Sequence, residues 1–213
     1  MQLYRKRNPV VSLKQKNYPL IVAYSLLQMI FFMAVILGVD VSSYNLDDLL
    51  KPGVVSISVF LVSVLLLGIL PDGLKASLVF WRLKNPLPGN RAFSHHAQND
   101  PRIDINTLIN KHEELPRRPA DQNRLWYQIY KKHEKEERIA NSHKEYLLTR
   151  DITQLSFFYL ILFGMAAGFV FNVESVLEGY ISILALVFVL SALAARNYGI
   201  RFVTNVLAID CHT

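Results

Sequence analysis

This chain has very little cysteine, and its long apolar runs contain no charged residues. Its 213 residues include one cysteine, Cys211, so no internal disulfide can form. Four runs contain no Asp, Glu, Lys or Arg: residues 19–39, 54–70, 152–173 and 179–195. Proton relays, ion-coupled transporters and voltage sensors need ionisable residues at depth in the bilayer. The uncharged runs therefore argue against these three classes.

The polar segment between the second and third runs also lacks the short motifs of common enzymes and metal sites. It has no G-x-S-x-G, no phosphate-cradling glycine loop, no Cys–His pairing and no His-Glu-x-x-His. The best metal-like group is His95-His96 with Asp100 and Asp104, but adjacent histidines rarely both reach one ion. We therefore expect ordinary loop polarity there, and neither an enzyme, a catalytic residue, a cofactor nor a metal.

Hydrophobic sequence is what the chain has in abundance, at 52% of its residues. A transmembrane helix needs about 20 apolar residues, with about 17 as the lower limit, and all four runs reach that length. The first run is longer than the core of a cleavable signal, so we expect it to remain as a span. The predicted fold is an all-α membrane protein with four transmembrane helices, arranged as two hairpins (19–70 and 152–195) around a small helical domain.

The distribution of charge predicts the orientation of these spans. Residues 1–18 form a basic arm with five bases and no acid, and residues 71–151 carry fifteen bases and eleven acids. The two short connecting loops, 40–53 and 174–178, are net acidic. Because basic loops stay in the cytoplasm, we expect an inner-membrane protein with both termini and the central domain on the cytoplasmic side.

The central segment opens with a predicted interfacial elbow. Pro71-Asp72-Gly73 should end the second span with a turn, and residues 73–84 mix apolar and basic side chains in the manner of a short amphipathic helix. Trp81, Arg82 and Lys84 are placed at the membrane interface, because Trp and basic residues anchor helices at the headgroups.

Three further helices are expected in the central domain. Asp104 or Asn106 should cap the first, and the second should start near Asp121. Ser142 and Glu145 fit a capping box that would launch the third helix, which could continue unbroken into the span 152–173. His112, His133 and His143 fall at helical interface positions or caps and are interpreted as structural.

Small and polar residues in the spans predict helix packing or oligomerisation. Gln28 is the polar interruption of the first span, and Gly164 and Gly168 form a G-x-x-x-G in the third. Such residues let helices approach closely or bond to each other, and both intrachain packing and oligomerisation remain open for the glycines. Gly199 is a possible helix break before the amphipathic tail, residues 196–213, which is expected to pack back on the central domain.

One group of residues suggests ligand binding. Bases neutralise phosphates and aromatic faces stack on nucleobases, so bases interleaved with aromatics suit a nucleotide or oligonucleotide. An acidic lipid, a protein partner or no ligand at all are the alternatives. The residues are Arg117, Arg118, Arg124, Trp126, Tyr127, Tyr130, Lys131 and Lys132.

The arrangement of four spans with an inserted polar domain resembles the small transmembrane effectors of bacterial anti-phage defence. That resemblance implies a homo-oligomeric effector that forms a channel or disrupts the bilayer when a nucleotide signal or a cytosolic partner protein engages its domain. The alternative is a membrane anchor or scaffold that docks a cytosolic partner and never conducts.

Overall fold

The computed structural model describes residues 12–36, 54–166, 168 and 174–213. Outside this part lie residues 1–11 of the predicted basic arm, 37–39 of the first predicted span, the predicted loop 40–53, and residues 167 and 169–173 of the third span. The described chain is all helical, with no strand in these ranges. The longer helices are α1 (Tyr18–Ile36), α3 (Val54–Ile69), α4 (Asp72–Phe80), α5 (Ile105–His112), α6 (Pro119–His133), α7 (Glu137–Met165) and α8 (Glu174–His212).

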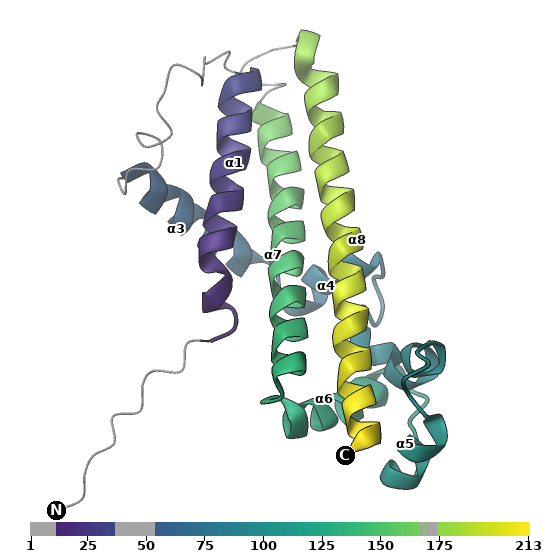
Figure 1. The fold of residues 1–213 in the computed structure, drawn as a ribbon. Helices are drawn as coiled ribbons and strands as arrows, with labels where there is room; N and C mark the ends of the chain where they lie inside the picture. The colour runs from purple at the N-terminus through teal and green to yellow at the C-terminus, as the bar shows by residue number, and fades with distance from the viewer. Residues whose placement is uncertain (1–11, 37–53, 167, 169–173) are drawn as a thin grey trace, which may run out of the picture.

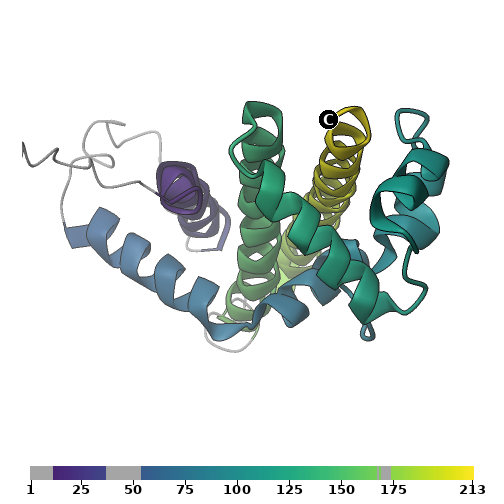
Figure 2. The same ribbon diagram turned by 90° about the horizontal axis from the view of Figure 1, so that it is seen from below.

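Three helices form an upright bundle. Helices α1, α7 and α8 run side by side, with α7 and α8 antiparallel and in the most extensive contact, while α4, α5 and α6 gather around the lower half of α8 (Figure 1). Seen from below, α3 crosses obliquely beside α1 instead of pairing along its length (Figure 2).

Two helical segments are long and apolar enough to cross a membrane, Gln15–Val35 and Glu178–His212, which is consistent with a membrane protein. A third possibility is the pair Leu61–Ile69 and Asp72–Phe80, which is bent by 87°. The four predicted spans are therefore not all matched by candidates in the described chain. Helix α3 has 16 residues and ends at this bend, and the apolar part of α7 reaches residues that are not described.

The helical domain, which we define as residues 71–151 together with residues 196–213 of α8, has its own apolar core. Helix α8 supplies Val203, Val206 and Leu207, which are fully buried against Leu108 of α5 and Ile129 of α6. The amphipathic tail thus packs on the central domain, as its sequence predicts. Burial of apolar side chains of this size, at about 1.5–3 kcal/mol each, is what holds the short helices in place.

Two local predictions about the ends of α5 and α6 agree with the structure. The Asp104 carboxylate accepts a hydrogen bond from the backbone N–H of Asn106 at 3.0 Å, so it caps α5 as expected. Helix α6 begins at Pro119, two residues before the expected start, because proline fits the first turn of a helix, where no backbone N–H is needed.

Two other local predictions are wrong. Ser142 is not a helix cap: α7 begins at Glu137, and the Ser142 hydroxyl donates to the carbonyl of Ile139 at 3.0 Å inside the helix. Gly199 does not break α8. A Cβ at this position would lie 2.9 Å from ring atoms of both Phe80 and Tyr146, so glycine is needed there for close packing of α4 and α7.

The predicted elbow is shorter than expected. Helix α4 ends at Phe80, and Trp81 adopts a left-handed conformation with φ of 53° that closes it. Arg82 and Lys84 follow in an exposed turn, so only the segment up to Phe80 is helical. The 87° bend nevertheless turns α4 away from α3, as an elbow requires.

Candidate functional site

A cleft opens between the start of α4, the short helix η3 (Pro88–Arg91), α6, α7 and α8. Its volume is about 320 Å³, within the usual size range of small-molecule sites. Aromatic side chains dominate its walls, and a buried arginine lies at one end. The lining residues are Asp72, Leu87, Pro88, Gly89, Asn123, Trp126, Tyr127, Tyr130, His143, Tyr146, Arg150 and Phe202.

The aromatic walls are held in fixed orientations. The Trp126 and Tyr130 rings stack with centroids 5.8 Å apart, and both meet Phe202 edge to face, at 5.2 and 5.3 Å. A Cβ on Gly89 would lie 2.8 Å from Trp126 Cε3, so η3 approaches α6 as closely as glycine permits. Side chains locked in this way present preorganised surfaces for stacking.

His143 joins this aromatic group through a hydrogen bond. Its Nδ1 lies 3.0 Å from the Tyr130 hydroxyl, and its ring stacks on Phe202 with centroids 4.5 Å apart. Burial, and then the positive charges of Arg150 and Lys131, lower the pKa of His143 to about 4. The imidazole is therefore neutral at pH 7, and its Nδ1 can accept a hydrogen bond from the Tyr130 hydroxyl.

Arg150 also lines the cleft. Its Nη1 donates to Asp72 at 3.1 Å, and its Nη2 donates to Asp151 at the same distance. The Arg150 and Asp151 side chains are buried, whereas the side chain of Asp72 is 74% exposed. The Arg150–Asp72 bond ties α7 to the first turn of α4, directly beyond the bend from α3.

The structure brings together part of the predicted ligand-binding group. Trp126, Tyr127 and Tyr130 line the cleft, and Tyr127 is 52% exposed at its mouth. Lys131 lies over the Tyr130 ring at 5.9 Å and pairs with Glu134. These residues share one face of α6, which is why their spacing could be recognised from the sequence.

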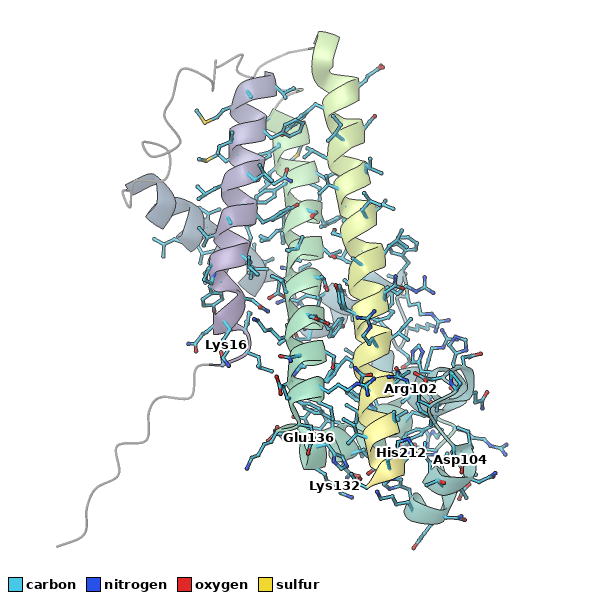
Figure 3. All side chains as sticks on the ribbon, in the orientation of Figure 1. Lys16, Arg102, Asp104, Lys132, Glu136 and His212 are labelled. Atoms are coloured by element: carbon cyan, nitrogen blue, oxygen red, sulfur yellow. The ribbon has the colours of Figure 1, made fainter. Side chains whose placement is uncertain are left out.

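The other predicted bases do not line the cleft. Arg124 is exposed on α6, and Arg117 and Arg118 are exposed just before that helix; Arg118 and Arg124 lie 4.0 and 3.5 Å from the Asp121 carboxylate. Lys132 lies at the lower end of the molecule (Figure 3). Sequence reasoning missed His143, Arg150 and Phe202 as cleft residues, because no local pattern shows which face α7 and α8 turn toward α6.

A second polar cluster lies at the end of α8. The buried Asp210 carboxylate receives His112 Nε2 at 2.7 Å, His133 Nε2 at 3.1 Å and Lys111 Nζ at 3.2 Å. Burial raises the pKa of Asp210, but these hydrogen bonds outweigh it and leave the pKa below 3.8. The cluster fastens α5 and α6 to α8, in agreement with a structural role for the two histidines.

The histidine pair lies in the short helix η4 (Ala92–His96) and not in the expected loop, and in the described residues no carboxylate set surrounds it. Asp100 is engaged by Arg102, and Asp104 caps α5, beside the last turn of α8 (Figure 3). In the described ranges, no group of three or more His, Cys, Asp or Glu side chains could hold a metal ion.

Polar and small residues of the bundle face other helices of the same chain. Gln28 is buried, the Ser63 hydroxyl donates to Ser25 at 2.8 Å, and Tyr24 bonds to Ser156 at 2.6 Å. A Cβ on Gly164 would lie 3.8 Å from Ile181 of α8, and Gly168 is half-buried. The 3.8 Å separation is an ordinary van der Waals distance, so packing against α8 does not require glycine at position 164.

No protein-family model, curated protein or solved structure matches this chain, so the site rests on its own geometry.

Proposed function

We propose that this protein is a ligand-controlled membrane effector, with four spans in the inner membrane and a cytoplasmic helical domain that reads a signal in the aromatic cleft. The observation that carries the proposal is the continuity of α7. This helix contributes His143, Tyr146 and Arg150 to the cleft and continues without a break to Met165, in the apolar bundle. A change at the cleft therefore acts directly on a helix of the bundle.

The ligand class follows from the chemistry of the cleft. The exposed face of Tyr127 and the ordered Trp126 and Tyr130 rings suit stacking with a planar base, and Arg150 suits a phosphate. Because Arg150 is already bonded to the exposed Asp72, an entering phosphate competes with that carboxylate. We infer a nucleotide or short oligonucleotide that binds at the cost of the Arg150–Asp72 bond.

The proposed mechanism converts this exchange into movement at the membrane. Loss of the Arg150–Asp72 bond removes one tie between α7 and the first turn of α4, and α4 is joined to α3 through the 87° bend. Helix α3 then moves relative to α1 and α7. In a homo-oligomer, we expect this movement to open a channel or disrupt the bilayer, as in the anti-phage effectors that the arrangement resembles.

Dye release from liposomes containing the purified full chain tests this proposal. We expect release on addition of a mixed set of nucleotides and short oligonucleotides, and little release without them. Tyr127→Ala should weaken the response, because base stacking contributes about 1–3 kcal/mol. Asp72→Asn should raise release without ligand, since it removes the carboxylate that holds Arg150. Asp121→Asn, on the solvent face of α6, is the matched control and should behave like the wild type.

A non-conducting anchor or scaffold is the second candidate. It is favoured by the hydrogen bonds of Ser63 with Ser25 and of Tyr24 with Ser156, which satisfy these polar groups of the bundle without a second copy of the chain. Native mass in mild detergent separates the two candidates. A monomer that releases no dye under any condition would reject the effector and favour the scaffold.

A further inference from the structure

A second, much smaller pocket lies behind the aromatic cleft, on the other side of Leu87 and Pro88. Three arginines line it: Arg82 after α4, Arg91 at the end of η3 and, from a distant part of the chain, Arg196 in α8. His95, His96 and Asn85 complete its polar lining, and its volume is about 30 Å³. It is too small for a nucleotide but has room for the oxygens of an oxyanion.

Positive charge in this pocket is not balanced by the protein. No Asp or Glu lines it, and Arg82, Arg91 and Arg196 make no ion pair with any carboxylate in the described part of the chain. The contrast with Arg102, Arg118, Arg124 and Arg150 is clear, since each of these has an acidic partner.

The three arginines influence each other and the neighbouring imidazoles. Burial, followed by the charges of Arg82 and Arg196, lowers the pKa of Arg91. Burial lowers the pKa of His96 to about 4, with further contributions from His95 and the same arginines. Like charges gathered without a counter-charge repel each other, and a bound anion relieves that repulsion.

The turn that carries Arg82 is held in an unusual backbone conformation. Trp81 and Asn85 on either side of it have φ values of 53° and 50°. Residues with a side chain adopt this left-handed region at a cost in free energy, which the surrounding structure must offset. The turn places Arg82 in the lining of the same pocket as the other two arginines.

The pocket lies where the apolar surface of the molecule meets the helical domain. Arg196 directly follows the uncharged run of α8, in which Leu190 and Leu193 are exposed. On the other element, Trp81 is 53% exposed and Leu83 is 92% exposed, next to Arg82. Exposed Trp and Leu beside arginine mark a membrane–water boundary, where basic pockets bind lipid headgroups.

We propose that Arg82, Arg91 and Arg196 form a binding site for the phosphate of an anionic lipid in the cytoplasmic leaflet. Trp81 and Leu83 lie among the acyl chains, and the three guanidinium groups hold the headgroup phosphate. This inference uses the topology of the proposed function, with the helical domain on the cytoplasmic side, but it does not depend on any ligand of the aromatic cleft.

Native mass spectrometry of the full chain in mild detergent tests the site, with phosphatidylglycerol and phosphatidylcholine added at equal amounts. The wild type should retain phosphatidylglycerol in preference to phosphatidylcholine. The triple variant Arg82→Gln, Arg91→Gln, Arg196→Gln should bind it at least about ten-fold more weakly, since each basic residue near an anionic surface contributes about five-fold. The matched control Arg117→Gln, Arg118→Gln, Arg124→Gln removes the same charge from the solvent face and should bind like the wild type.

Three outcomes would overturn the proposal. Wild-type retention of phosphatidylglycerol by the Arg82, Arg91 and Arg196 variant would show that the pocket is not the site. Equal losses in both would show that only the net charge of the chain matters. Excess inorganic phosphate that abolishes the preference for phosphatidylglycerol, and that raises the melting temperature of the wild type but not of the pocket variant, would identify a free-phosphate site instead.

A variant with Lys at all three positions keeps the proposal testable if the Gln variant unfolds. It preserves the charge but removes the planar guanidinium fork, so we expect intermediate retention of phosphatidylglycerol. Phosphatidylglycerol retention equal to that of the Arg117, Arg118 and Arg124 control variant would argue against a site shaped for phosphate. Because none of these measurements uses dye release or a nucleotide, failure here is distinct from failure of the proposed effector function.

Discussion

The two halves of α8 belong to one continuous helix but have opposite surroundings. In the first half, Ile183, Leu186 and Leu190 are exposed on the surface of the bundle. In the second half, Phe202, Val203, Val206 and Leu207 are all buried, and so are the polar Thr204, Asn205 and Asp210. An apolar surface of the first kind suits lipid, whereas the second kind is the core of a domain.

The difference lies in what covers the helix. Helices α4, α5 and α6 surround only the second half, so polar groups there find protein partners, as Asp210 does with Lys111, His112 and His133. The first half packs on α7 and, through Tyr180, on Phe31 and Phe32 of α1, and its remaining face presents aliphatic side chains outward. Hydrophobicity alone therefore does not separate a membrane segment from a core segment. The two are separated by where polar side chains with hydrogen-bond partners occur.

The sharpest test of this contrast is Asp210→Ala. The change removes the hydrogen bonds of two half-buried imidazoles and of the Lys111 ammonium to the buried carboxylate, so at about 1–2 kcal/mol each we expect a loss of about 3–5 kcal/mol in the free energy of unfolding. Thermal unfolding followed by circular dichroism in detergent measures it. Asp121→Ala, which removes an exposed carboxylate from α6, should cost less than about 1 kcal/mol. Similar losses for the two variants would mean that the Asp210 cluster does not hold the domain.

A matched pair of leucines compares the two halves directly. Leu207 is 0% exposed and Leu186 is 56% exposed. Leu207→Ala should destabilise by about 2–5 kcal/mol, because it leaves a cavity in the core. Leu186→Ala should have a much smaller effect on unfolding in detergent, where its side chain already contacts apolar solvent. If Leu186→Ala were as costly, the first half would be covered by protein in solution, as in an oligomer.

A pair of glycines in α8 makes the same comparison with a smaller effect. A Cβ on Gly179 meets nothing within 4 Å, whereas one on Gly199 would lie 2.9 Å from Phe80 and Tyr146. Gly199→Ala should cost about 1–3 kcal/mol through overpacking. Gly179→Ala should be neutral or should stabilise the helix by up to about 1 kcal/mol. Equal melting temperatures for the two variants would contradict the close approach at Gly199.

The dependence of stability on pH gives the smallest expected effect. His143 has a pKa of about 4 in the folded chain, against 6.5 for a free histidine. Folding therefore favours the neutral imidazole. Its contribution to the free energy of unfolding is fully present above pH 6.5 and is lost as the pH falls toward 4. Between pH 7 and 5 we expect a loss of roughly 1–2 kcal/mol from this residue. His143→Gln should flatten the melting profile over that interval, and an unchanged slope would refute the assignment.

Local features were predictable from the sequence and distant pairings were not. The cap at Asp104, the start of α6 and the shared face of Trp126 and Tyr130 all follow from spacing within one helix. The helix start predicted at Ser142 is wrong because the capping-box pattern lies inside α7, which begins five residues earlier at Glu137.

The candidate site was predictable only in part for the same reason. Its aromatic face could be recognised on α6, but Arg150 and Phe202 come from helices whose packing depends on the whole core. The arginine pocket is an extreme case, because Arg91 and Arg196 are separated by most of the helical domain and by two apolar runs.

The length of α8 has a mechanical consequence. Its 39 residues form a rod of about 58 Å, at 1.5 Å per residue. Its base is clamped by α4, α5 and α6, so the far end amplifies any rotation of the clamp, as the tip of a lever does. A tilt of about 5° at the base would displace the opposite end by about 5 Å, roughly the pitch of one helical turn. Rearrangements too small to reshape the domain would thus be large at the outer face of the bundle.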